Sequence, residues 1–243
     1  MIDNRLNPQF YIIGVGPGDP ELLTIKAVRI ISSVDVITYP STSQEKSRSR
    51  QIISKYITEH HKELAYNLPM EIDPSKAQAA YDQVSKEIIT RLKEGYSVAL
   101  LCEGDPFFYG SAIHLYLRIA GKFTTQVIPG ITSLTASPAA AGLPMATRNE
   151  IVKILPATLD ISKLETELET CEAAVIIKVG RHLEKVVHAI RNKRLREYAL
   201  LVLNVSDDDQ RIISFKELDR VKQHQYQPYF SMILISRHKR AVP

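Results

Sequence analysis

Short apolar runs alternate with amphipathic segments along the first half of the chain. The runs are rich in β-branched and aromatic residues, which is typical of buried strands. Between them, apolar residues recur at helical spacing, for example over residues 22–31 and 77–92. Strands that alternate with helices favour a mostly parallel sheet with helices on its faces. The expected strands are residues 10–15, 34–39, 96–101 and 124–128.

The alternation restarts after residues 145–150, which resemble a linker. Residues 211–215 are expected to form a hairpin partner for the strand before them. We therefore predict an α/β protein of two α/β domains. Residues 1–145 would hold a parallel sheet and residues 146–243 a mixed sheet. The expected strands of the second half are residues 151–155, 173–179, 199–205 and 229–235.

The segment LCEGDPFFYG, residues 101–110, joins an expected strand to an expected helix. Glu103 and Asp105 flank one glycine, and three aromatic residues follow. Ligands of open α/β sheets lie beyond the carboxyl ends of strands, so this segment is a candidate site. Asp105 precedes a proline and is held extended, and the three aromatic rings cannot all face one core. The alternative is an ordinary helix start, with acids placed against the helix dipole.

Two further turns follow expected strands. Residues 14–20 read GVGPGDP, which suits a tight turn where backbone approaches something closely. The turn is neither a Walker loop nor a dinucleotide fingerprint, because the third glycine comes one residue early and the two prolines lack amide donors. Asp19 is expected to cap one helix that covers the pattern of residues 22–31. Residues 129–133, PGITS, form the second turn.

Composition limits the class of protein. The chain has 243 residues, 44% of them hydrophobic and 24% charged, with a net charge of +4. This describes an ordinary globular protein. Basic residues are spread along the chain and aromatic residues do not follow them, which argues against nucleic acid as a partner. A small polyanionic substrate is consistent with the modest positive charge.

Cys102 and Cys171 are too few for a disulfide framework and are expected to be plain thiols. The adjacent His60 and His61 are expected at the surface, and no metal site is predicted. The first ten residues show no signal-peptide pattern. The uncharged run of residues 123–147 contains too many prolines and glycines for a membrane span, so no membrane partner is expected and a cytoplasmic location is predicted.

Three segments together, residues 14–28, 102–111 and 129–133, resemble the tetrapyrrole methylase family in their order and separation. The resemblance covers nearly the whole chain. It implies an enzyme that uses S-adenosylmethionine as its cofactor, with two α/β domains and the active site in the cleft between them. It also implies a small tetrapyrrole substrate and a homodimer. Segments at residues 47–52, 155–158, 178–181 and 228–235 are most similar to members that act in corrin (cobalamin) synthesis.

The resemblance also implies roles for individual residues. The run Val202-Leu203-Asn204 departs from the family pattern, so no side-chain role is inferred there. The catalytic base stays unidentified, although Glu103 and Tyr109 are near the site in sequence. The residues that the resemblance assigns to cofactor binding are Pro17, Glu103, Gly104, Asp105, Phe108, Thr132, Ser133, Lys178 and Val179.

The carboxylates of a tetrapyrrole should pair with basic residues, and arginine offers a bidentate fork. Arg50 and Arg181 are the preferred candidates, with Arg48, Arg148 and Lys178 as others. Each of them alone fits a solvated surface charge as well. Three alternatives to a methylase of corrin synthesis remain open. The chain could be a family member that methylates a different position of the tetrapyrrole ring, a nucleotide-dependent oxidoreductase using the turn at residues 14–18, or a binding module without activity.

Overall fold

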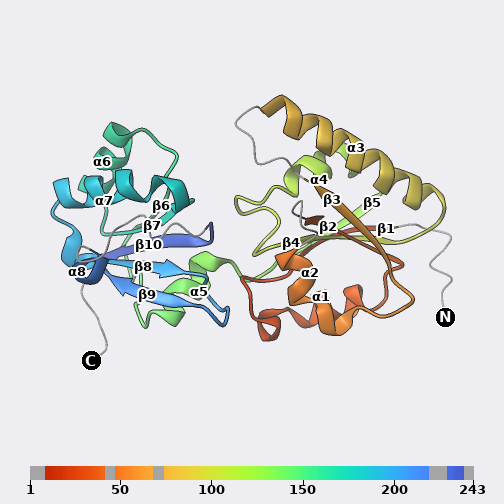
Figure 1. The fold of residues 1–243 in the computed structure, drawn as a ribbon, viewed down its shortest axis with the longest axis horizontal. Helices are drawn as coiled ribbons and strands as arrows, with labels where there is room; N and C mark the ends of the chain where they lie inside the picture. The colour runs from red at the N-terminus through yellow and green to blue at the C-terminus, as the bar shows by residue number, and fades with distance from the viewer. Residues whose placement is uncertain (1–8, 42–46, 68–73, 219–228, 238–243) are drawn as a thin grey trace. The chain divides into compact units, whose positions relative to one another are not determined.

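The computed structural model describes residues 9–41, 47–67, 74–218 and 229–237 (Figure 1). The chain divides into two compact units, residues 1–132 and 133–243. The domain boundary predicted between residues 145 and 146 lies downstream of this division, beyond helix α5 (Ser133–Ala140), and stays a prediction.

The first unit contains a five-stranded sheet in the order β3-β2-β4-β1-β5. All four pairings are parallel, which confirms the parallel sheet expected for the first half. At its centre, Ile12 of β1 pairs with Leu100 of β4 and Val127 of β5. The strands are β1 (Gln9–Gly14), β2 (Val36–Ser41), β3 (Lys62–Asn67), β4 (Val98–Cys102) and β5 (Thr124–Ile128).

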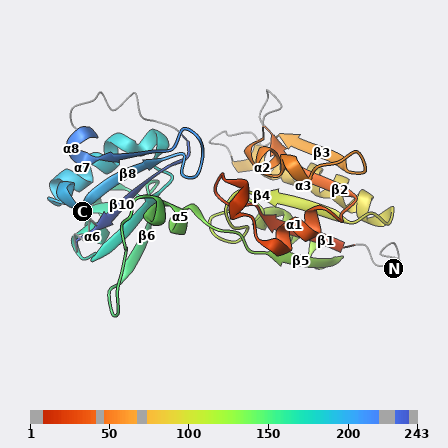
Figure 2. The ribbon, with the colours of Figure 1, turned by 90° about the horizontal axis from the view of Figure 1, so that it is seen from below.

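Helices cover both faces of this sheet (Figures 1 and 2). Helices α3 (Pro74–Lys93) and α4 (Ile113–Ile119) pack on one face, in a core that includes Phe10, Ile12 and Leu100. Helices α1 (Ile25–Ile31) and α2 (Arg48–Ile52) pack on the other face, against Ile13, Ile37 and Leu101. Strands β1, β2 and β4 contain apolar runs because both of their faces are largely buried.

The prediction of a single helix over residues 22–31 is wrong, because the structure has two helices there. Asp19 accepts a hydrogen bond from Glu21 N as predicted, but it caps only the short 3-10 helix η2 (Pro20–Leu22). The chain then becomes extended at Leu23, and Thr24 caps α1 by accepting a hydrogen bond from Ala27 N. A second capping residue inside an apolar helical pattern therefore restarts the helix.

The second unit contains a mixed five-stranded sheet in the order β6-β7-β10-β8-β9 (Figure 1). β6 and β7 are parallel, whereas β10 runs antiparallel to both of its neighbours. β8 and β9 pair antiparallel, which confirms the expected hairpin. The strands are β6 (Val152–Pro156), β7 (Ala173–Ile177), β8 (Ala199–Leu203), β9 (Arg211–Ser214) and β10 (Ser231–Ser236).

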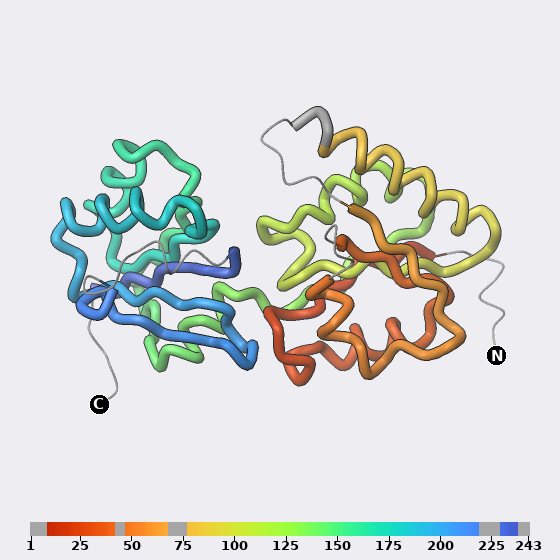
Figure 3. The backbone as a smooth tube through the Cα atoms, in the orientation of Figure 1, coloured from red at the N-terminus to blue at the C-terminus, as the bar shows by residue number. Residues whose placement is uncertain are grey.

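Two apolar clusters hold the second unit together. On one face of the sheet, α6 (Ile161–Glu169), α7 (Leu183–Asn192) and α8 (Phe215–Leu218) contribute to a core with Ile176 and Ile233. On the other face, residues of α5 pack with Val175 and Leu234. The tube in Figure 3 follows the chain from α5 into β6. The remaining short helices of the described residues are η3 (Ser54–Tyr56), η4 (Gly180–His182) and η5 (Arg196–Tyr198).

The expectation that both His60 and His61 lie at the surface is wrong for His61. Its side chain is buried, with Nε2 within 2.9 Å of Ile31 O at the end of α1 and Nδ1 accepting a hydrogen bond from Thr58 N. Cys102 and Cys171 are free thiols, and both are buried. In the described residues, no helix is long and apolar enough to cross a membrane, and no group of three or more acidic, histidine or cysteine side chains could hold a metal ion.

Candidate functional site

The chain leaves the two central strands of the first sheet in opposite directions. After β1 it passes through α1 on one face toward β2, and after β4 it passes through α4 on the other face toward β5. In open α/β sheets, ligands bind beyond the carboxyl ends of strands at such a switch point. The turns that follow β1 and β4, residues 14–19 and 103–109, therefore flank the candidate site.

These two turns are joined by backbone hydrogen bonds. Val15 N donates to Cys102 O at 2.9 Å, Gly104 N donates to Gly16 O at 2.8 Å, and Gly16 N donates to Gly104 O at 3.4 Å. Gly16 and Gly104 have φ angles of 82° and 65°, a region that glycine adopts without strain. The glycines at these two positions allow the turns to pair beyond the ends of their strands.

The turn after β5 also meets this pair through glycine. A Cβ atom at Gly130 would lie 2.1 Å from Gly104 O and 2.8 Å from Gly14 C. A Cβ atom at Gly14 would lie 2.5 Å from Gly104 O and 2.6 Å from Gly130 N. We call Gly14, Gly104 and Gly130 the glycine junction. It has no room for a side chain at Gly14 or Gly130, and it brings three strand ends together through their backbones.

Asp105 ties the turns after β4 and β5 together. Its Oδ2 accepts a hydrogen bond from Gly130 N at 3.1 Å, and its Oδ1 accepts one from Phe107 N at 2.9 Å. Each carboxylate oxygen therefore already holds a backbone amide. Glu103, Gly104 and Thr132 are partly buried beside it, with Thr132 Cα 3.8 Å from the position of a Cβ at Gly104. The structure thus brings these predicted cofactor residues together, and Ser133 follows as the first residue of α5.

Three exposed aromatic rings follow Asp105. Phe107, Phe108 and Tyr109 are 49%, 46% and 50% exposed, which confirms that they do not share one core. The Phe107 ring lies edge-on to Tyr116, and the Phe108 ring lies edge-on to Tyr109. Tyr109 has a φ of 57°, a strained conformation for a residue with a side chain. Half-exposed apolar rings held in this way are available to cover a ligand.

Helix α2 contributes a contact that sequence reasoning missed. Arg48 Nη2 donates a hydrogen bond to Pro17 O at 2.5 Å. In the sequence, Arg48 is a candidate partner for substrate carboxylates and residues 47–52 are a segment that carries the resemblance, but no contact of Arg48 within the protein is predicted. No local pattern indicates that one of its arginines reaches the turn after β1.

The predicted substrate residue Arg50 is engaged elsewhere in the same helix. Its Nε and Nη2 donate to the two carboxylate oxygens of Glu63 at 2.9 and 3.0 Å, and Tyr39 donates to Glu63 Oε2 at 2.7 Å. The Arg50 hydrogen bonds lower the pKa of Glu63, with Tyr39 adding to the effect. Burial raises the pKa of Tyr39, as does its bond to Glu63. Arg50 thus anchors α2 to β3.

Cys102 ends β4 directly behind the site. Burial raises the pKa of its thiol to about 12, and the neighbouring Glu103 charge acts in the same direction. The side chain packs beneath Gly110, where a Cβ would lie 3.1 Å from Sγ. A protonated, buried thiol is a poor nucleophile, so Cys102 is a packing residue.

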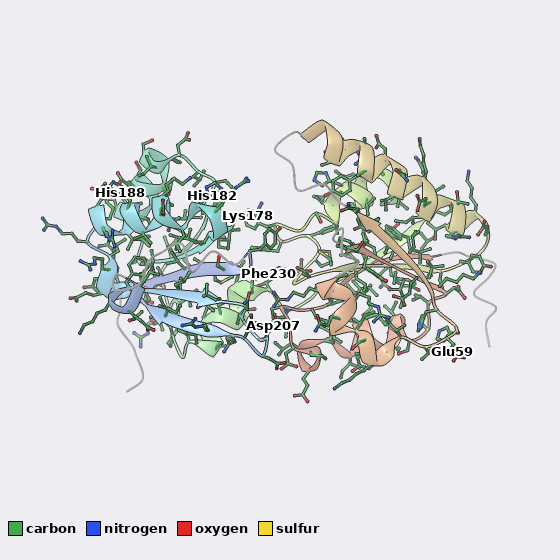
Figure 4. The ribbon with its side chains drawn as sticks, viewed as in Figure 1. Glu59, Lys178, His182, His188, Asp207 and Phe230 are labelled. Atoms are coloured by element: carbon green, nitrogen blue, oxygen red, sulfur yellow. The ribbon has the colours of Figure 1, made fainter. Side chains whose placement is uncertain are left out.

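In the second unit, three connections meet at one end of the inner strands β7, β10 and β8, which we call the edge of the sheet. Lys178 and Val179 follow β7, Asn204 follows β8, and Phe230 precedes β10. Figure 4 shows Lys178 and Phe230 at this end of the unit and His188 at the opposite end. Lys178 and Asn204 have φ angles of 58° and 46°, so the backbone is strained at two of the three connections.

Hydrogen bonds fix this edge. Gly180 N donates to Ser231 Oγ at 2.9 Å, and Asn204 N donates to Phe230 O at 2.9 Å. Val179 is buried, whereas the Lys178 side chain is exposed. The edge therefore offers a backbone fixed by hydrogen bonds, at the residues Lys178 and Val179 that the resemblance assigns to cofactor binding.

Basic groups extend from this edge into α7. The predicted substrate residue Arg181 is exposed, and His182 beside it is partly buried. Burial lowers the pKa of His182, and the charges of Lys185 and Arg181 lower it further. Of the two preferred substrate residues, Arg181 presents its guanidinium to solvent and Arg50 is held by Glu63.

A family model decides the assignment. Residues 9–219 match the model described as Tetrapyrrole (Corrin/Porphyrin) Methylases. The chain belongs to the tetrapyrrole methylase family. Its membership confirms the resemblance of the three turns, and it places the glycine junction and the loop of residues 103–109 within a family of methyltransferases.

Two curated relatives illustrate its position in the family. The chain is 33% identical to Precorrin-2 C(20)-methyltransferase from Sinorhizobium sp, over 92% of this chain and 93% of that one. It is 34% identical to Cobalamin biosynthesis protein CobIJ from Mycobacterium bovis, over 94% of this chain but only 46% of that protein. The chain therefore spans about half the length of CobIJ.

Solved structures share the fold. Cobalt precorrin-4 methyltransferase, CbiF, matches with a TM-score of 0.75 and 22% identity, over 97% of each chain. Uroporphyrin-III C-methyl transferase from Thermus thermophilus, complexed with S-adenyl homocysteine, matches with a TM-score of 0.67 and 20% identity, over 93% of this chain and 96% of that one. These matches confirm a two-domain α/β fold.

Proposed function

We propose that this tetrapyrrole methylase uses S-adenosylmethionine to methylate carbon 20 of precorrin-2, or of its cobalt complex, in cobalamin biosynthesis. The observation that carries the proposal is the 33% identity to the Sinorhizobium enzyme over nearly the full length of both chains. The match to CobIJ, a protein named for cobalamin biosynthesis, supports the proposal across 46% of that protein's length. The alternative within the family is methylation of another ring position.

The residues of the candidate site fit S-adenosylmethionine. The glycine junction is bare backbone, and a Cβ atom at Gly14 or Gly130 would overlap its neighbours. Bare backbone can follow the shape of a folded cofactor without long side chains. When bound, the cofactor supplies an electrophilic methyl group. The complex of the Thermus relative with S-adenyl homocysteine supports this choice.

Charge and exclusion of water define the proposed roles of the loop after β4. Glu103 is partly buried and can complement the positive sulfonium through its carboxylate. Phe108 supplies an apolar surface that would exclude water there and strengthen that attraction. Gly104 and Asp105 shape the loop, and Pro17 and Thr132 complete the first unit's proposed contribution to cofactor binding. Ser133, the first residue of the second unit, is proposed to add to it. Lys178 and Val179 are proposed to contribute backbone groups to cofactor binding from the second unit.

The proposed reaction needs orientation more than chemical activation. The meso carbon of a reduced tetrapyrrole is already nucleophilic; its bond to the methyl carbon forms as the carbon–sulfur bond breaks, and the ring then releases a proton. Holding the two reactants in line can supply an effective molarity of roughly 10⁵–10⁸ M. The residue that accepts the proton is unassigned.

Arg181 and Arg50 are proposed to pair with substrate carboxylates. The exposed Arg181 can do so directly, whereas Arg50 would have to share its guanidinium with Glu63. Alanine substitution of each, with the KM for the tetrapyrrole measured at saturating cofactor, tests both. Unchanged KM values for both variants would refute the assignment.

Thermal unfolding in the presence of ligands separates the proposed function from an oxidoreductase. S-Adenosylmethionine and S-adenosylhomocysteine should each raise the unfolding midpoint, because a ligand that binds only the native state stabilises it by mass action. NAD(P)H should leave the midpoint unchanged. A shift with NAD(P)H alone would contradict the methylase assignment for this chain, and no shift with any ligand would favour the binding module without activity.

We further propose that the protein is a cytoplasmic homodimer. The support is an open apolar hollow of about 650 Å³ that α5 and the following residues line, including Leu134, Ala139 and Leu143. Exposed apolar surface of this kind marks interaction sites. Sedimentation of the wild type and of Ala139→Glu should show a dimer that the charge weakens. A monomeric wild type would refute the proposal.

A further inference from the structure

Arg48 reaches from α2 to the turn that follows β1. Its Nη2 donates to Pro17 O at 2.5 Å, and the side chain is partly buried. A hydrogen bond from a guanidinium to a carbonyl oxygen is stronger than a neutral one. Arg48 is therefore positioned to fix the peptide group that joins Pro17 to Gly18.

The rest of α2 is anchored independently of this contact. Ser47 caps the helix by accepting a hydrogen bond from Arg50 N, and Ile52 and Ile53 are buried in the core beneath it. Arg50 holds Glu63 of β3 with two hydrogen bonds. The helix thus presents Arg48 from a fixed base, so loss of the Arg48 side chain need not release the helix.

The orientation of the Pro17 carbonyl determines where the next amide points. In a trans peptide group the C=O and the following N–H point in opposite directions, and no cis peptide bond occurs among the described residues. Because Arg48 holds Pro17 O on one side, Gly18 N–H is directed to the other. Pro17 and Pro20 have no N–H of their own, so Gly18 is one of only two amide donors in residues 17–20.

Gly18 N–H has no acceptor in the described part of the protein, although Gly18 is buried. Buried backbone donors are nearly always paired, with protein, water or ligand. The adjacent residues of the same turn are fixed by their pairing with the loop after β4, as Gly16 and Gly104 show. The Gly18 amide is therefore an unsatisfied hydrogen-bond donor at the candidate site.

We propose that Arg48 is a positioning residue for cofactor binding: it holds the Pro17–Gly18 peptide group so that Gly18 N–H donates a hydrogen bond to an acceptor group of S-adenosylmethionine. This proposal rests on the S-adenosylmethionine part of the proposed function and not on the identity of the methylated carbon. It explains why an arginine on α2 contacts the turn instead of facing a substrate.

The test is calorimetric titration of the full-length protein with S-adenosylhomocysteine. Arg48→Ala should weaken binding roughly tenfold, because the peptide group loses a charge-assisted hydrogen bond. Arg48→Lys keeps a donor and should bind within about threefold of wild type. Lys55→Ala, which removes one exposed charge from the neighbouring η3, is the matched control and should bind as the wild type does.

An NMR spectrum of the backbone amides gives the second readout. In the wild type and in Arg48→Lys, the Gly18 N–H signal should shift when S-adenosylhomocysteine is added; in Arg48→Ala the shift should be smaller. Wild-type affinity in Arg48→Ala, or equal weakening in Arg48→Ala and Arg48→Lys, would overturn the proposal. If the wild type binds no S-adenosylhomocysteine, the cofactor assignment itself fails, and that result is separable from a failure of Arg48 alone.

Discussion

Gly130→Ala should disable the site by steric overlap alone. The added Cβ would lie 2.1 Å from Gly104 O and 2.8 Å from Gly14 C, whereas ordinary contact begins near 3.4 Å. All of these neighbours are backbone atoms of adjacent strand ends, so no flexible side chain can move aside. Relief requires the loops after β1 or β4 to move by about 1 Å, the shortfall between 2.1 and 3.4 Å.

The expected magnitude follows from that displacement. A shift of about 1 Å in residues that position reactants can lower the rate roughly 100-fold, so kcat/KM for methyl transfer should fall by about that factor. Overpacking typically costs ~1–3 kcal/mol of unfolding free energy, which corresponds to roughly 2–12 °C in the unfolding midpoint for a chain of this size. The two losses share one cause.

Gly121→Ala is the matched control. Gly121 lies in the same unit, and a Cβ there would meet nothing within 4 Å. Its kcat/KM and unfolding midpoint should stay close to wild-type values, as should its affinity for S-adenosylhomocysteine. If Gly130→Ala also kept wild-type kcat/KM and midpoint, the glycine junction would not constrain the site and the steric reasoning would be refuted.

Three other predictions follow from the same contacts. Asp105→Ala leaves two backbone amides without acceptors, so its unfolding free energy in denaturant titration should fall by ~1–3 kcal/mol, while Asp105→Asn, which keeps one acceptor oxygen, should lose less; equal losses would contradict this. Glu63 has a lowered pKa in the folded state, so its contribution to the free energy of unfolding is present above the ordinary glutamate pKa and is lost as pH falls through the lower folded value. On acidification the wild type should lose up to ~1 kcal/mol more unfolding free energy than Glu63→Gln, and parallel pH profiles of the two proteins would contradict this. The raised pKa values of Cys102 and Cys171 predict that a thiol reagent at pH 8 labels neither until the protein unfolds, a result that one fast-reacting thiol would disprove.

Local patterns identified much of the fold. The apolar runs located the strands of both sheets to within a few residues, except for the more polar edge strand β3, and the alternation with helices gave the parallel sheet of the first unit. The turns after β1, β4 and β5 were recognised because their glycines, prolines and acids are unusual for strand ends. Gly95, which follows the helical pattern of residues 77–92, has a φ of 89° just after α3 ends, a conformation in which glycine commonly terminates a helix.

The remaining features depend on contacts between distant segments. The glycine junction arises only because β4, β1 and β5 are neighbours in register, which no single segment encodes. The insertion of β10 between β7 and β8 is equally non-local. The burial of His61 depends on the end of α1, thirty positions earlier in the chain. For the same reason the contact from Arg48 to Pro17 could not be anticipated.

The most direct test is to incubate the purified protein with methyl-labelled S-adenosylmethionine and either metal-free precorrin-2 or its cobalt complex, and to locate the label by NMR. We predict a single labelled methyl group on carbon 20 of one or both substrates, and the preferred substrate shows whether cobalt precedes this step. Label on a different ring carbon, or no transfer to either substrate, would contradict the proposed function.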